Sequence, residues 1–197
     1  MSKRQRLSAP ERRELIELAA IGVFAERGFR GASMDEIAKR SGVSVPVVYD
    51  HFASKLDLYR RLLERSRNAL LEMWGAHLFG DDPAEERIPR AIDAWARFVE
   101  DNRDAARMYF REAAGDAEAD AVHKEIREQA RVALGVLLGR LVDEPRDQEQ
   151  LEMSGEVIRA GLVGLAIWWH EHPHVPREEI VRTALDVLWS GYLREAT

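Results

Sequence analysis

Helix boundary signals crowd together between residues 28 and 55, and they restrict the fold more than any other feature of this sequence. Gly28 follows a run with helical apolar spacing, Ser33 stands three residues before Glu36, and Gly42 comes soon after. A serine followed at this spacing by a glutamate is typical of a helix start, and a glycine is typical of a helix end. These signals predict one longer helix followed by two very short ones, joined by tight turns.

The stretch SVPVVYDHF at residues 44–52 has the β-branched and aromatic composition of a strand in helical surroundings. We expect a helix, with Ser44 as its N-cap and Pro46 in the first turn, where a missing N–H costs nothing. Val48 and Phe52 would face the core, which leaves an outward face of Val45, Pro46, Val47 and Tyr49. An exposed apolar face is typical of a helix that reads thymine methyl groups in the major groove. The alternative is buried filler in an ordinary helical domain.

Polar side chains near this face are of the kinds that hold DNA phosphates. Tyr49 and His51 can donate hydrogen bonds, Lys55 adds positive charge, and Ser33 can present its hydroxyl beside backbone N–H groups at a helix start. Asp50 lies among them, and no role for an acidic side chain follows from the sequence.

Charge is distributed unevenly along the 197 residues. Residues 1–60 carry eleven Lys or Arg and eight Asp or Glu, a net charge of +3, whereas the remainder carries 18 and 27, a net charge of −9. A basic head on an acidic body fits local rather than general binding of nucleic acid.

Helical spacing dominates the rest of the chain, so we predict an all-α protein of about nine helices. Pro89 would delay or kink the fifth. No stretch alternates long enough to predict a strand, and no internal repeat is present. The helices after residue 55 are expected at about 55–78, from 82–83 onward, 104–114, 118–142, 148–170 and 177–193.

Several classes of function have little support. The sequence has no cysteine, no glycine-rich phosphate loop and no Gly-x-Ser-x-Gly turn, so we expect no enzyme, no catalytic residues and no cofactor. His170, His172 and His174 alternate around a proline, which is a poor pattern for one metal site, and we predict none. Charges interrupt any signal core, and the longest apolar run is too short for a membrane span, so the cytoplasm is the expected location.

Three runs together resemble the DNA-binding domain of the TetR family of bacterial transcriptional regulators. They are SMDEIA at residues 33–38, GVS at 42–44 and Y-x-HF-x-x-K-x-x-L at 49–58. The resemblance covers about residues 10–60. It implies a helix-turn-helix DNA-binding domain at residues 1–55, with a short basic arm, and a helical domain at residues 56–197 that binds an effector and dimerises. By position, the DNA contacts would be Ser33, Ser44, Val45, Pro46, Val47, Tyr49, His51 and Lys55.

The same resemblance implies a homodimer on a pseudo-palindromic double-stranded operator. The last two helices are apolar on more than one side, which favours a partner chain over a purely intramolecular core. The expected dimer residues are Ile158, Leu162, Leu165, Trp169, Val181, Leu185, Leu188 and Tyr192.

Aromatic residues of the acidic body suggest an effector pocket enclosed by its helices, as the resemblance implies, although such residues more often form plain core. The expected lining is Trp74, His77, Trp95, Phe98, Met108, His123, Ile126 and Trp168. The leading hypothesis is a repressor released from its operator by a small, largely apolar effector. The alternatives are a helical small-molecule-binding or catalytic protein with a non-functional head, and a non-specific DNA-packaging protein.

Overall fold

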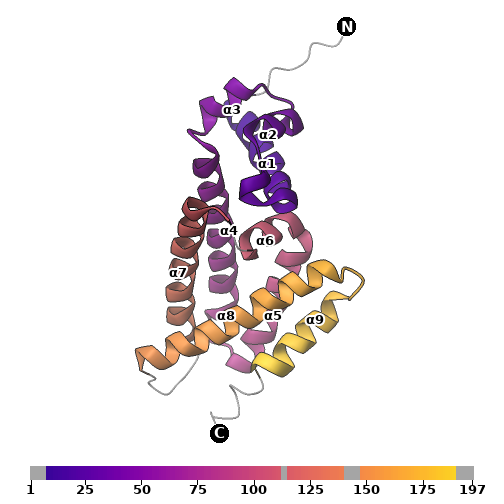
Figure 1. The fold of residues 1–197 in the computed structure, drawn as a ribbon. Coiled ribbons are helices and arrows are strands. Elements are labelled where there is room, and N and C mark those ends of the chain that lie inside the picture. Colours follow the sequence, from indigo (N-terminus) through magenta and orange to yellow (C-terminus); the bar gives the residue numbers. More distant parts are fainter. Residues whose placement is uncertain (1–7, 112–114, 140–146, 190–197) are drawn as a thin grey trace.

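The computed structural model describes residues 8–111, 115–139 and 147–189, and every regular element in these ranges is a helix (Figure 1). This confirms the all-α prediction. The helices are α1 Ala9–Gly31, α2 Met34–Ser41, α3 Val45–His51, α4 Lys55–Leu78, α5 Ala84–Asp101, α6 Arg103–Phe110, α7 Ala117–Gly139, α8 Gln148–Glu171 and α9 Arg177–Ala184, which continues as a π-helical turn at Leu185–Trp189.

Serine caps set most of the helix starts at the N-terminal end. The hydroxyl of Ser8 accepts a hydrogen bond from the Glu11 N–H, and the Glu11 carboxylate accepts one from the Ser8 N–H. Ser33 and Ser54 cap α2 and α4 with their hydroxyls. Ser44 holds the N-cap position of α3 with an extended backbone, but its side chain makes no capping hydrogen bond, contrary to the expectation.

Two glycines with positive φ end helices as the sequence predicts. Gly42 has a φ of 71° and closes α2 in the left-handed conformation. Gly28 has a φ of 67°, which breaks the helical backbone inside α1. One further helical turn follows and ends at Gly31. The prediction that the first helix stops at Gly28 is therefore right for its regular part.

The stretch at residues 44–52 forms a helix, as expected. Val48 is fully buried and Phe52 is 1% exposed, so both side chains belong to the core. Pro46 stands in the first turn of α3, where the helix has no hydrogen bond to lose. The strand-like composition is overridden by the position of the proline and by the burial of this pair.

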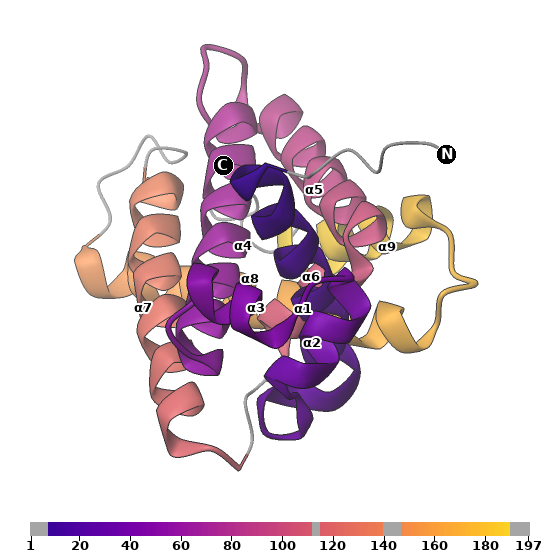
Figure 2. The same ribbon diagram turned by 90° about the horizontal axis from the view of Figure 1, so that it is seen from above.

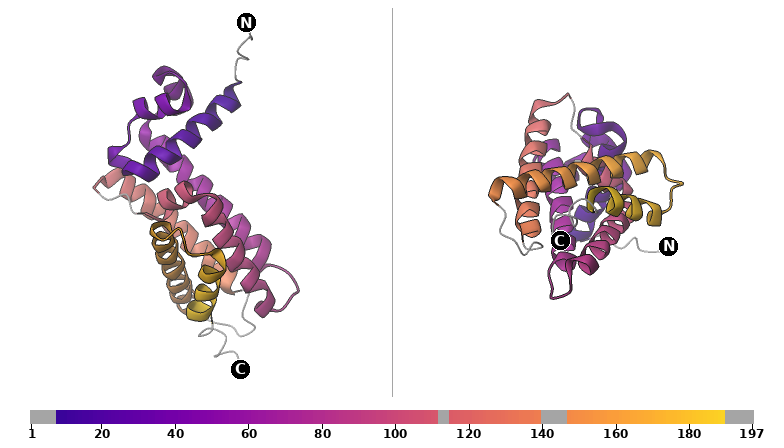
Figure 3. Two further views of the ribbon diagram at one scale, coloured as in Figure 1. Left: turned by 90° about the vertical axis from the view of Figure 1, so that its right-hand side faces the viewer. Right: turned by 90° about the horizontal axis from the view of Figure 1, so that it is seen from below.

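We call α1–α3 the head and α5–α9 the body, and the 24-residue helix α4 joins them (Figures 1 and 3). Leu58, Tyr59, Leu62 and Leu63 of α4 pack in the core of the head, whereas Leu70 packs in the core of the body. Because α4 serves both cores, a domain boundary at residue 55 stays a prediction.

Within the body, α4 lies beside α5 and α7, and α8 crosses them (Figures 1 and 2). Pro89 lies inside α5 without ending it. The helix at residues 104–114 was predicted too long at its end, since α6 stops at Phe110. Among the described helices, none combines the length and the apolar composition needed to cross a membrane.

Candidate nucleic-acid interface and ligand cavity

The outer surface of α3 combines apolar and polar side chains. Pro46 and Asp50 are exposed, and Tyr49 is 52% exposed. Val45 and Val47 are only half-buried, and Val45 also packs against the core of the head. The outward apolar face is therefore narrower than the sequence suggests.

Lys55 occupies a different environment from the other expected DNA contacts. Its ammonium donates to the carbonyl oxygens of Phe29 at 2.8 Å and Ala32 at 3.0 Å, and it lies 4.4 Å from the centre of the Phe29 ring. The end of a helix presents unpaired carbonyls, and a cation there is favourable. In this geometry the Lys55 charge ties the end of α1 to the start of α4.

Ion pairs on the surface of the head fix α1 against α2. Arg40 donates to both carboxylate oxygens of Glu26 at 2.6 Å and to Glu36 at 2.7 Å, while Arg27 pairs with Glu36. The hydrogen bond from Arg40 lowers the pKa of Glu26, so this carboxyl stays ionised at neutral pH. A bidentate pair of this kind sets orientation as well as attraction.

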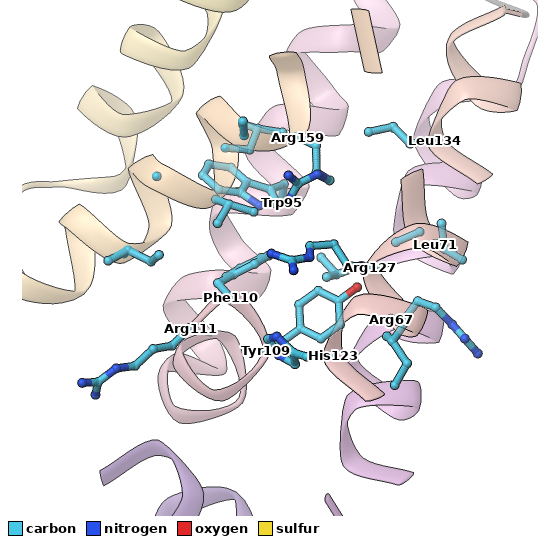
Figure 4. Close-up of a pocket in the computed structure, with 18 of the residues that line it drawn as sticks. Arg67, Leu71, Trp95, Tyr109, Phe110, Arg111, His123, Arg127, Leu134 and Arg159 are labelled. Atoms are coloured by element: carbon cyan, nitrogen blue, oxygen red, sulfur yellow. The ribbon is translucent and has the colours of Figure 1, made fainter. Parts of the chain in front are cut away.

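A cavity of about 410 Å³ lies in the body between α4, α5, α7 and α8, beside the end of α6 (Figure 4). Its volume is in the usual range for a small-molecule site. Most of its wall is apolar, and the side chains that form this part are Leu70, Leu71, Trp74, Trp95, Phe110, Ile126, Ala130, Leu134, Ala160, Leu162, Val163 and Ile167.

The charged side chains of the cavity all have one sign. Arg67, Arg111, Arg127 and Arg159 line it, and no Asp or Glu does. Tyr109 lies among them, and burial raises the pKa of its hydroxyl to about 12, so this group is a neutral hydrogen-bond donor at physiological pH. Four cationic groups beside an apolar wall suit a ligand with an apolar part and an anionic part.

One face of α8 exposes an uncharged stripe to solvent. Met153 is 62% exposed, Val157 is 64% and Trp168 is 44%. Ala160 and Gly164 lie between them, at the edge of the larger cavity, and the spacing of four, three, four and four residues places all five on one side of the helix. An apolar stripe of this length on an exposed helix is typical of a protein–protein contact.

Comparison with known proteins gives the family of the chain. The model for bacterial regulatory proteins of the tetR family matches residues 16–62. Over 193 residues the chain is 31% identical to the HTH-type transcriptional activator FasR of Mycolicibacterium smegmatis. The match covers 94% of this chain and 85% of FasR. The chain belongs to the TetR family and is a transcriptional regulator.

Other proteins match a part of the chain in sequence or the whole chain in fold. The HTH-type transcriptional repressor BepR of Brucella suis is 42% identical over 65 residues, which are 33% of this chain and 31% of the relative. A TetR-like transcriptional regulator from Rhodococcus sp. RHA1 superposes with a TM-score of 0.76 at 22% identity, over 95% of this chain and 99% of that one. FadR from Bacillus subtilis, solved with stearoyl-CoA, gives a TM-score of 0.75 at 19% identity, over 90% and 98%.

Against this TetR fold, the structure brings together half of the residues expected around the effector. Trp74, Trp95, His123 and Ile126 line the cavity, and His77, Phe98, Met108 and Trp168 do not. Met108 packs in the core of the head, and Trp168 stacks on His172 at the surface with 4.0 Å between ring centres. The arginines and Tyr109 were missed, because they come from separate helices and share no local pattern.

The expected dimer residues are divided between α8 and the last described helix. Ile158, Leu162 and Trp169 are 7%, 4% and 2% exposed within the single chain and pack in the core of the body, so their place in a dimer contact stays a prediction. The remaining ones that the structure describes, Leu165, Val181, Leu185 and Leu188, are half-buried against the same core, and Tyr192 lies outside the described residues.

Three histidines lie at the end of α8 and in the loop that follows it, and their surroundings differ. The His172 ring nitrogen Nδ1 lies 2.8 Å from the Trp168 carbonyl oxygen, and His170 faces a second cavity between α5, α6 and α8. Within the described residues, no group of three His, Asp or Glu side chains is placed to hold a metal ion.

Proposed function

We propose that this TetR-family regulator binds its operator as a homodimer and that an amphipathic anionic ligand in the body cavity changes its operator affinity. The observation that carries this proposal is the cavity itself, because its wall is apolar and its four charged lining residues are all arginines. This refines the sequence-based hypothesis of a largely apolar effector.

The proposed ligand class is a long-chain acyl group with an anionic end, as in a fatty acid or an acyl-CoA. The apolar wall would take the chain, and Arg67 and Arg111 with Tyr109 would hold the anionic end, because Arg159 is already paired with Glu156. Support comes also from FadR of Bacillus subtilis, whose structure holds stearoyl-CoA within a similar fold. Because that likeness is at low identity, the charge of the cavity is the stronger argument.

For the operator contacts, we propose the N-terminal half of α3 together with its polar neighbours. Pro46 and Tyr49 present exposed side chains, and Ser33 and Ser44 are exposed at the starts of α2 and α3. Few base-edge hydrogen bonds are available from Val-Pro-Val, so groove shape and methyl contacts would supply much of the specificity.

For the dimer, we propose that the exposed stripe of α8 meets the same stripe of a second copy. An isologous contact needs one self-complementary surface, and small residues at its centre allow close approach of the two helices. Ala160 and Gly164 supply that centre, and Met153, Val157 and Trp168 supply the apolar rim.

A mobility-shift titration tests the regulator proposal. The DNA upstream of the gene and its neighbours is titrated at low salt, with and without stearate, and with methyl stearate as a ligand of equal chain length that lacks the charge. We expect a sequence-specific shift, and a change in operator affinity of roughly 5- to 150-fold with stearate. We expect little effect from the methyl ester.

The outcomes separate the remaining hypotheses. The relatives include one named an activator and one named a repressor, so the direction of the change assigns the sign, for which a repressor was the sequence-based expectation. Absence of any specific shift would favour a non-functional head, and equal affinity for every duplex would favour packaging. An equal response to stearate and its methyl ester would remove the anionic part of the ligand from the proposal.

A further inference from the structure

Three arginines follow one another at four-residue spacing on α6 and directly after it. They are Arg103, Arg107 and Arg111, and this spacing places them on one side of the helix. None of the three makes an ion pair or a side-chain hydrogen bond with the residues that the structure describes; Arg103 instead lies 5.9 Å above the Trp169 ring. Like charges at this spacing repel, so an unpaired row of this kind costs stability.

Most other arginines of the body form ion pairs with carboxylates. Arg131 donates to Glu128 and Glu152, Arg159 donates to Glu156, and Arg177 donates to Asp93 and Glu100. The α6 row therefore stands out against an acidic body with carboxylates available elsewhere. A row kept free of such partners is available to an external anion.

The row lines a second cavity of about 180 Å³ between α5, α6 and α8. All three arginines belong to its wall, together with two acidic residues, Glu100 and Glu171, the first of which is already paired with Arg177. His170 also faces this cavity, and its pKa is lowered by burial first and by the positive charge of Arg107 next. The local potential is therefore positive and the imidazole adds no charge of its own at neutral pH.

The second cavity adjoins the larger one. Both are lined by Phe110, Arg111 and Ile167, so one end of each meets the same three side chains. Figure 4 shows Arg111 pointing away from the other labelled residues of the larger cavity, which agrees with its place at the junction. A third recess under the head, also of about 180 Å³, shares Arg107 and Arg111 and adds Arg30, Arg27, which is paired with Glu36, and Glu26, which is paired with Arg40.

We propose that the row of Arg103, Arg107 and Arg111 binds the phosphate groups of a ligand whose acyl chain occupies the larger cavity. The ligand class is an acyl chain joined to a carrier with several phosphates, as in an acyl-CoA. This inference rests on the proposed function and narrows its ligand. Guanidinium groups at one-turn spacing match phosphates that follow one another along a carrier, and each can donate two parallel hydrogen bonds.

A competing cationic surface lies on the other side of the larger cavity, at Lys124, Arg127, Arg131 and Arg159. There, Arg131 and Arg159 are held by carboxylates, so phosphates would have to displace Glu128 and Glu156. In the part of the chain that the structure describes, the α6 row has no carboxylate to displace, so it is the better site for the phosphate groups of the ligand.

Equilibrium binding of two ligands to the full-length protein tests the inference. Stearoyl-CoA and stearate have the same acyl chain, and only stearoyl-CoA carries the phosphate-bearing CoA group. We expect the wild type to bind stearoyl-CoA at least about 10-fold more tightly than stearate, since charge-assisted hydrogen bonds add to the affinity. In the double variant Arg103→Gln, Arg107→Gln we expect the stearoyl-CoA affinity to fall roughly 10- to 100-fold, with the stearate affinity within twofold of wild type.

Two controls keep the result interpretable. The double variant Arg90→Gln, Arg182→Gln removes the same charge from exposed side chains. These side chains line neither the larger cavity, nor the second cavity, nor the recess under the head, so we expect no change in the affinity for stearoyl-CoA or for stearate. The variant Arg107→Lys keeps the charge and should restore part of the stearoyl-CoA affinity. Thermal melting of each variant shows that loss of binding is not loss of folding.

The outcomes also separate this inference from the proposed function. If the wild type binds both ligands equally, or if the α6 double variant keeps full stearoyl-CoA affinity, the phosphate site is wrong and the anionic acyl ligand still stands. If the wild type binds neither ligand, the proposed ligand class fails and the phosphate site falls with it.

Discussion

The head pairs its surface arginine Arg40 with carboxylates, whereas the body contains both paired arginines and arginines that line cavities. In the head, Arg40 is fully engaged with Glu26 and Glu36, and it holds α1 against α2. In the body, Arg67 and Arg111 face cavities instead. Internal pairing fits the rigid surface that the proposed operator contact needs, and arginines that line cavities fit the proposed anionic ligand.

The two regions also differ in the size of the space that their side chains leave open. The aromatic rings of Phe24, Phe29 and Tyr59 meet in the head, with ring centres 4.9 to 6.1 Å apart, and they border the recess of about 180 Å³. In the body, Trp95 is buried and lines the larger cavity of about 410 Å³. Unfilled space costs stability, and the proposed ligand would offset this cost in the body.

The largest expected effect tests the tight packing of the head. Phe52 is 1% exposed, and the Arg13 guanidinium lies 5.4 Å from its ring centre. We expect Phe52→Ala to lower the free energy of unfolding by about 3–5 kcal/mol, because a large buried ring leaves a cavity. Chemical denaturation measures it, with Phe79→Ala as the control, since Phe79 is 44% exposed and should cost less than about 1 kcal/mol. If both variants lost the same free energy of unfolding, the tight packing around Phe52 would be contradicted.

The next effect concerns the exposed stripe of the body. In a two-fold dimer, Val157→Asp would place two negative charges near each other in an apolar contact. We expect the dimer dissociation constant to rise at least about 100-fold, or about 3 kcal/mol. Light scattering over a concentration series measures it. Val132→Asp is the matched control on α7, where the valine is 46% exposed and off the stripe. Equal behaviour of both variants would place the dimer contact elsewhere.

A smaller effect distinguishes two roles of Lys55 in the head. The sequence predicts a phosphate contact, whereas its ammonium here binds the carbonyls of Phe29 and Ala32. With the structural role, Lys55→Met should destabilise the protein by about 1.5–3 kcal/mol and leave the salt dependence of operator binding unchanged. With the phosphate role, the slope of log K against log salt should become shallower by about one. Lys39→Met, at an exposed position of α2, is the control for charge alone.

The fold of the head could be predicted from the sequence because its signals are local. Ser33, Gly42 and Ser54 each act on backbone groups within a few residues, and the structure bears out the helix boundaries that they predict. The inward pair Val48 and Phe52 follows from the helical period alone.

The candidate site in the body could be predicted only in part, because it is assembled from five helices and from Arg111, which follows α6. Trp95 and Ile126 were found through their apolar faces, but Arg67 and Arg159 lie 92 residues apart in the sequence and meet only in the folded chain. The buried face of α8 could not be predicted for the same reason. Ile158 and Val157 are neighbours in the sequence, and only packing of α8 against α6, α7 and α9 decides which one is covered.

The length of α4 converts a small change of angle at one end of the helix into a larger displacement at the other end. With 24 residues in one unbroken helix, α4 is about 36 Å long, since each residue adds about 1.5 Å. A rigid rod of that length, tilted by about 5° at the end that lines the cavity, moves its other end by about 3 Å, close to the rise of one base pair. In the proposed dimer, a tilt of this size would move each head by about one base pair and so put the two heads out of register with a fixed DNA site.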